Sequence, residues 1–133
     1  MWTSRAHTLV DLGDDVFTRG RPHPMIDHRL RNERIVREAA DPQVAVILLD
    51  VVLGFGSHPD PAAELVPAIE SARQVAARGG REIAVLGHIC GTHGDPQNLQ
   101  QQTTRLSLAG MLLTESNAQA VRLAHQLVAE KRS

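Results

Sequence analysis

Two histidines lie in a phrase that the chain repeats. Gly56-Ser57-His58-Pro59-Asp60-Pro61 returns as Gly91-Thr92-His93-Gly94-Asp95-Pro96, about 35 residues later, which is the length of one strand-plus-helix unit. An imidazole in such a loop can donate a hydrogen bond, transfer a proton or attack a phosphoryl group. His58 and His93 are therefore candidate catalytic residues. The candidate substrate-binding residues around them are Gly54, Gly56, Ser57, Gly91, Thr92 and Gly94.

Both copies of the phrase follow an apolar run and end in an Asp-Pro pair, which is typical of a helix N-terminus. The free N–H groups and partial positive charge of such a terminus suit a phosphate or a carboxylate. At the carboxyl edge of a parallel sheet, both loops would lie where α/β proteins usually bind ligands. Helix capping explains Asp60 and Asp95, and the Gly-Ser/Thr pairs suit tight turns. The functional signal therefore comes from the histidine at the same place in both loops.

Further candidates lie on the predicted strands. Asp50 ends an apolar run, and a carboxylate there either orients a loop histidine or anchors a loop by hydrogen bonding. His88, Cys90 and His93 form an H-x-C-x-x-H cluster. That spacing leaves open a zinc site without an evident fourth ligand, or a cysteine nucleophile, although cysteine is often only a small buried residue.

The segment Gly13–Met25 is long for a strand–helix connection, and long loops are often functional. Its cations and histidine, Arg19, Arg21 and His23, are candidate groups for an anionic substrate. The alternative is a solvated loop in which acidic and basic side chains pair with one another.

Apolar periodicity predicts four strands, at His7–Leu12, Val44–Val52, Ile83–Cys90 and Met111–Thr114. Helices are expected between them. The first helix is expected at His28–Ala40, with Asp27 as its cap. The next two would begin at Asp60 and at Asp95, and the last would begin with a capping box of Ser116 and Gln119. The order βαβαβαβα predicts an α/β protein with a mainly parallel sheet. Four strands are few for this class, so one edge strand–helix unit is expected to be missing.

Composition narrows the function classes. The 133 residues are predicted to form a single domain, and 42% hydrophobic with 22% charged residues fits a soluble globular protein. A net charge of −1 and 2% aromatic residues argue against binding to nucleic acid. No apolar run of the sequence is long enough to span a membrane. One cysteine and no signal peptide predict a cytoplasmic location. The Walker A, nucleophile-elbow and dinucleotide-binding signatures are absent.

Several stretches of the chain together resemble a known family. They are His7 to Asp15, Thr18-Arg19-Gly20-Arg21-Pro22-His23-Pro24-Met25-Ile26-Asp27, Leu48 to Gly54 with His58-Pro59-Asp60-Pro61, and Cys90-Gly91-Thr92 with Gly94-Asp95-Pro96-Gln97. These stretches cover nearly the whole chain, and they resemble the C-terminal part of the FdrA family. That family is similar to the α subunit of succinyl-CoA synthetase and is described as acyl-CoA synthetase-like.

The resemblance implies a three-layer, flavodoxin-like ligase domain that belongs to a multi-chain enzyme. Acyl or carbamoyl transfer is the implied reaction, because some FdrA proteins are associated with a carbamoyltransferase activity involving other subunits. A partner chain would carry the CoA-binding domain and the first ligase-domain elements, and CoA or a nucleotide would bind through it rather than to this chain alone. Asp50 falls near the glutamate that serves the phosphohistidine in the synthetases, whereas their Gly-His-Ala-Gly motif is absent. The alternative is a non-catalytic assembly domain of a larger, oligomeric complex.

Overall fold

The fold alternates helices with the strands of one sheet. It comes from a computed structural model that describes residues 3–14, 19–20, 23 and 27–132, so the candidate Arg21 lies outside the described residues. The elements of the described chain are α2 (Arg29–Ala39), β1 (Val46–Val52), α3 (Pro61–Arg78), β2 (Ala84–Cys90), α4 (Leu99–Leu108), β3 (Leu112–Thr114) and α5 (Asn117–Arg132). None of the described helices is long and apolar enough to cross a membrane.

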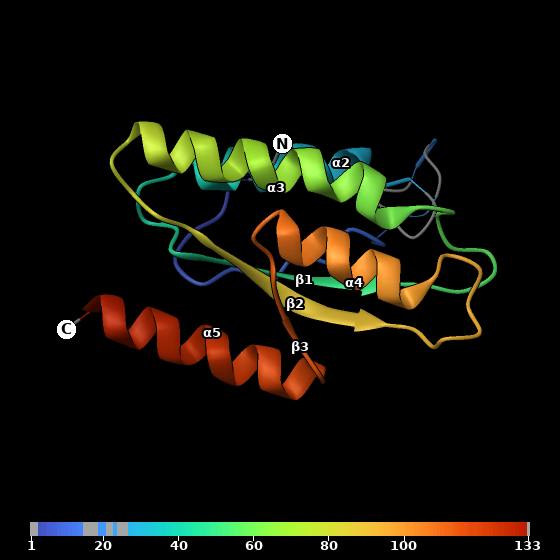
Figure 1. Cartoon of the computed structure of the whole chain (residues 1–133). Coiled ribbons are helices and arrows are strands. Elements are labelled where there is room, and N and C mark those ends of the chain that lie inside the picture. Colours follow the sequence, from blue (N-terminus) through green and yellow to red (C-terminus); the bar gives the residue numbers. More distant parts are fainter. Residues whose placement is uncertain (1–2, 15–18, 21–22, 24–26, 133) are drawn as a thin grey trace.

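The three strands form one parallel sheet in the order β1-β2-β3. Helices α2, α3 and α4 lie on one side of the sheet and α5 lies on the other, as Figure 1 shows. The prediction of a layered α/β protein with a parallel sheet is therefore confirmed, and this arrangement is consistent with a flavodoxin-like fold.

The two faces of the sheet are covered unequally. Odd-numbered residues of β1 and β2 enter the main core, where they pack with α3; this core includes Val51, Val85, Ile89, Leu65 and Ile69. Even-numbered residues face α5, the described helix that packs on that side of the sheet. Leu86 at the centre of this face is 0% exposed, whereas Leu48 on β1 is 41% exposed. The α5 face is therefore incomplete beside β1.

Local sequence signals set most helix ends as expected. The Asp60 carboxylate accepts a hydrogen bond from the Ala63 N–H and caps α3. At α2 the N-cap is His28 rather than the expected Asp27; Asp27 lies one residue earlier, and its carboxylate accepts from the N–H of Arg29, the first residue of α2. Ser116 Oγ accepts from the Gln119 N–H, and the Gln119 side chain accepts in return from the N–H of Glu115, one residue before the position expected for a capping box.

Two predictions about the elements are wrong. His7–Leu12 is not a strand: no described segment pairs with it, and Leu9 is 99% exposed. A strand needs a neighbour for its backbone groups, and the sheet offers none at this segment. Asp95 and Pro96 do not begin α4, because the Asp95 carboxylate accepts from the Thr92 N–H within its own loop. Asn98 caps α4 instead, through its side chain and the Gln101 N–H.

Candidate functional site

The two glycine-histidine loops lie side by side, joined by one buried glutamine. Gln97 follows the second loop, and its side-chain oxygen accepts from the Gly54 N–H. Its side-chain NH₂ donates to the carbonyl oxygens of Gly54, at 2.7 Å, and of His58, at 3.1 Å. All three bonds connect residues about 40 positions apart in the sequence, so the loops form one edge of the molecule. Sequence reasoning missed Gln97, because a buried amide has no distinctive spacing.

A second glutamine, Gln102 of α4, closes the N-terminus of α3. Its oxygen accepts from the buried N–H of Ala62, and its NH₂ donates to the Asp60 carboxylate at 2.9 Å. Arg105 also donates to both oxygens of Asp60. Burial would raise the pKa of Asp60, but the hydrogen bonds from Gln102 and Arg105 outweigh it and hold the pKa below its usual value. These contacts use the N–H groups that were expected to hold an anion at α3.

His58 is held in a defined orientation at the end of the first loop. Its Nδ1 accepts from the Asp60 N–H at 3.0 Å, so in the neutral ring Nε2 carries the proton. The His58 ring stacks on that of His28, with centroids 5.0 Å apart, and Nε2 lies 3.8 Å from a Glu64 oxygen. This arrangement makes Nε2 a hydrogen-bond donor rather than a nucleophile. His28 was not predicted as a site residue.

The second loop is shaped by its own polar groups. Thr92 Oγ1 accepts from the Gly94 N–H, and the Asp95 carboxylate accepts from the Thr92 N–H. His93 is exposed on this loop, and among the described residues no ring contact joins it to His58. The loops are therefore neighbours through Gln97, and not through a contact between the His58 and His93 rings.

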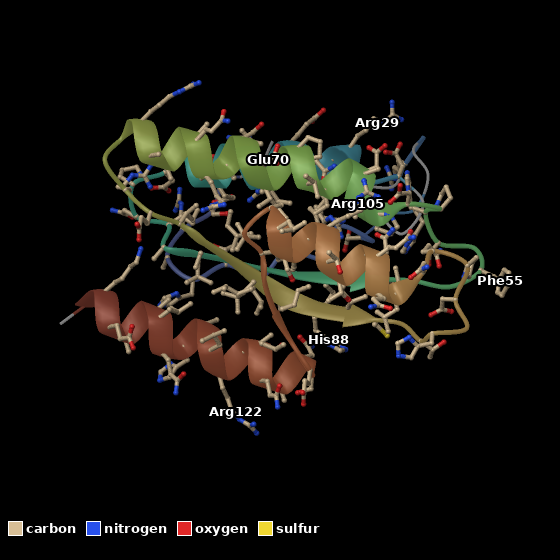
Figure 2. All side chains as sticks on the ribbon, in the orientation of Figure 1. Arg29, Phe55, Glu70, His88, Arg105 and Arg122 are labelled. Carbon is tan, nitrogen blue, oxygen red and sulfur yellow. The ribbon has the colours of Figure 1, made fainter. Side chains whose placement is uncertain are left out.

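Asp50 instead lies beside His88. The register pairs Asp50 with His88, and His88 with Thr114, so the three side chains share the α5 face near the carboxyl ends of the strands. His88 Nδ1 lies 3.1 Å from the Thr114 carbonyl oxygen, which can only accept, so Nδ1 carries the proton and Nε2 keeps its lone pair. Figure 2 shows His88 close to the start of α5. In the neutral ring, His88 Nε2 is therefore free to accept a hydrogen bond.

The remaining candidates are scattered. Arg19 and His23 are exposed. Among the described residues no three His, Cys, Asp or Glu side chains gather in a way that could hold a metal ion. His88, Cys90 and His93 therefore do not gather into one cluster in this structure.

Arg31 of α2 is a further residue that sequence reasoning missed. Its Nη1 donates to the Asp50 carbonyl oxygen at 3.0 Å. Its Nε and Nη2 are buried without a hydrogen-bond partner among the described residues. Burial lowers the pKa of this guanidinium to about 10, against the opposing charge of Asp50. Nothing in the sequence separates Arg31 from the other arginines of α2.

A groove of about 370 Å³ lies between α2 and α3, and its polar lining is acidic. Its lining includes Glu33, Glu64 and Asn32 and contains no cationic side chain. The phosphates of CoA need cations or free N–H groups nearby, so this groove does not fit CoA.

With a parallel α/β sheet and glycine-rich loops at its carboxyl edge established, comparison with known proteins gives the family. The chain belongs to the CoA-ligase family, whose model matches residues 2–127. It is similar to YahF of Escherichia coli (strain K12), described as an uncharacterized protein, with 46% identity over 122 residues. The matched region covers 92% of this chain and 24% of YahF, so the chain spans about a quarter of its relative's length.

Proposed function

We propose that this chain is a subunit or fragment of a cytoplasmic, oligomeric, FdrA-type acyl-CoA synthetase-like enzyme. Its part is to help bind an anionic acyl or carbamoyl phosphate group at the carboxyl edge of the sheet. The observation that carries the proposal is the contact of Gln97 with both glycine-histidine loops. This contact holds two loops from separate strand–helix units in one place, as a binding site requires. The family match supports the ligase class.

The residues take distinct roles in this proposal. His58 donates a hydrogen bond from Nε2 to the anion, because its Nδ1 is occupied by the Asp60 N–H. Exposed His93 and the Gly91–Gly94 backbone approach from the second loop. Asp50 beside His88 handles protons at the same edge. Arg19, Arg21 and His23 close over the anion as cationic or donor groups.

We also propose a partner that binds beside this domain. The groove between α2 and α3 does not suit CoA, and the chain covers 24% of YahF, so CoA or a nucleotide would bind to the remaining parts of the enzyme. These parts include the CoA-binding domain and the first ligase-domain elements.

The anion site can be tested on the chain alone by NMR titration with carbamoyl phosphate and acetyl phosphate. We expect shift changes confined to the amides of residues 54–58 and 91–94. Gln97→Ala should weaken binding about tenfold, because it frees the two loops from each other. Gln101→Ala, on an exposed neighbour with no side-chain bond to the loops, is the matched control. Shift changes spread over surface arginines would contradict the proposal.

The alternative of a non-catalytic assembly domain has one observation in its favour, since His58 already uses Nδ1 and its ring face within the fold. His58→Ala and His93→Ala separate the two functions. A catalytic edge predicts a loss of activity in the assembled enzyme, whereas full activity of both variants would support the assembly domain.

A further inference from the structure

Phe55 lies uncovered at the tip of the first glycine-histidine loop. The Ser57 N–H donates to the Gly54 carbonyl oxygen at 3.3 Å, which closes a β-turn with Phe55 at its second position. Gly56, at the third position, has a φ of +87°, as a type II turn requires. Phe55 is 90% exposed, and Figure 2 shows it pointing away from the sheet and the helices. The fold of the chain therefore gives this aromatic side chain no apolar surroundings.

The backbone that carries Phe55 is held in place. Buried Gln97 accepts from the Gly54 N–H and donates to the Gly54 carbonyl oxygen, and it also donates to the His58 carbonyl oxygen. A side chain on a fixed backbone loses little conformational freedom on binding, so Phe55 is pre-organised for a contact. Burying one aromatic side chain removes about 150–250 Å² from water, which is why such residues dominate the energetics of protein interfaces.

The groove between α2 and α3 offers a hollow of matching chemistry. Its volume of about 370 Å³ leaves room for a phenyl ring. Its apolar lining consists of Val36, Ala63, Pro67 and Ala68. The groove begins in the first turn of α3, the helix that follows the Phe55 loop, so the ring and the groove lie at the same end of the molecule (Figure 1). Two copies related by a twofold axis can therefore exchange their rings reciprocally.

The charges on the two surfaces also match. The rim of the groove carries Glu33 and Glu64 and no cationic side chain. The first loop, Leu53–Pro59, carries no carboxylate. On the neighbouring second loop the Asp95 carboxylate is bonded within its own loop, whereas His93 is exposed. The loops therefore present N–H donors rather than acids to the acidic rim, which favours a second copy of this chain as the occupant of the groove.

We propose that this chain forms a twofold dimer in which Phe55 of each copy lies in the α2–α3 groove of the other. The two rings and the two grooves together bury about 600–1,000 Å², which is at the low end for specific protein interfaces. The dimer is therefore weak, with a Kd on the order of 100 µM. The proposal goes beyond the proposed function, because the Phe55 side chain and the groove take no part in anion binding.

Sedimentation equilibrium of the chain from about 10 µM to about 1 mM tests the dimer. Phe55→Ser should raise the Kd about a hundredfold, because it removes both apolar contacts. Leu108→Ser is the matched control, because Leu108 on α4 is 82% exposed and lies outside the groove. A monomer at the highest concentration, growth beyond a dimer, or equal affinity of Phe55→Ser and Leu108→Ser overturns the proposal. No anion is added, so failure here is distinct from failure of the phosphate titration.

A mixing experiment identifies the groove as the site that receives Phe55. Ser71→Trp, at an exposed position, fills the groove and leaves Phe55 intact, and Ser107→Trp on the exposed side of α4 is its control. Phe55→Ser and Ser71→Trp should each dimerise about a hundredfold more weakly than the unaltered chain, whereas their mixture should form a heterodimer only about tenfold weaker, because one contact is intact. NMR of ¹⁵N-labelled Phe55→Ser should show this as shift changes at the Val36 and Ala63 amides. A mixture that associates no better than the two variants alone rejects the groove.

Discussion

Replacing Gln102 with methionine tests the claim that one glutamine holds the first loop against α4. Methionine keeps the volume of the buried side chain, which is 3% exposed, but cannot bond to Ala62 and Asp60. The Ala62 N–H is then buried without an acceptor, which costs about 1–3 kcal/mol. Losing the bond to the Asp60 carboxylate adds only about 0.5 kcal/mol, because that carboxylate is 43% exposed and keeps Arg105.

The total is a loss of about 1.5–3.5 kcal/mol in the free energy of unfolding. With a urea dependence of about 2 kcal/mol per molar for a small protein, the unfolding midpoint should fall by about 1–2 M. Gln101→Met on the exposed face of α4 is the control and should change the free energy by less than about 0.5 kcal/mol. Gln102→Met should also raise the pKa of Asp60 toward its usual value, because the hydrogen bond from Gln102 is lost; ¹³C NMR measures this pKa. A midpoint equal to that of the control would refute the reasoning.

Three further predictions concern stability. Gly87→Ala should lower the free energy of unfolding by more than about 4 kcal/mol, measured by heat or urea, because a Cβ there would lie 1.8 Å from the Leu49 carbonyl oxygen. Gly94→Ala is the control and should be tolerated, because the atom nearest to its Cβ would lie 3.7 Å away. The pKa of Asp60 is lowered from 3.8 in the folded protein, so the ionised carboxylate stabilises the fold above about pH 4. This stabilisation is lost as the pH falls further. In Asp60→Asn, this part of the acid dependence should disappear from urea midpoints measured between about pH 5 and 2.5. Arg31→Met should stabilise the isolated chain by about 1–3 kcal/mol, because burial lowers the pKa of this guanidinium to about 10, well below its usual value, and so disfavours its charge. An unchanged urea midpoint would contradict this.

Signals that act within a few residues were predicted well from the sequence. The apolar runs that became β1 and β2 differ from their predicted starts by at most two residues. The Asp60-Pro61 start of α3 and the Ser116 cap of α5 were also found, because a cap depends on side chains within one helical turn. Such signals work because the bonding partner is nearby in the chain.

Predictions that needed a distant partner were less successful. His7–Leu12 has a strand-like pattern, yet strand formation depends on a neighbour that the described chain does not place beside it. Asp95 has the same local sequence as Asp60, but it bonds back to Thr92 rather than forward to a helix. Identical side chains thus differ in role because the two loops follow different paths.

By itself, the sequence determined the alternation of strands and helices, the parallel sheet, and the glycine-histidine loops at its carboxyl edge. Only the tertiary structure decided which groups meet there: Gln97 joins the loops, Asp50 lies beside His88, and Arg31 bonds to the open edge of β1. The physical reason is that periodicity and capping depend on neighbours along the chain. Hydrogen-bond partners about 20 to 40 residues apart are fixed by the register of the sheet and the packing of helices on it.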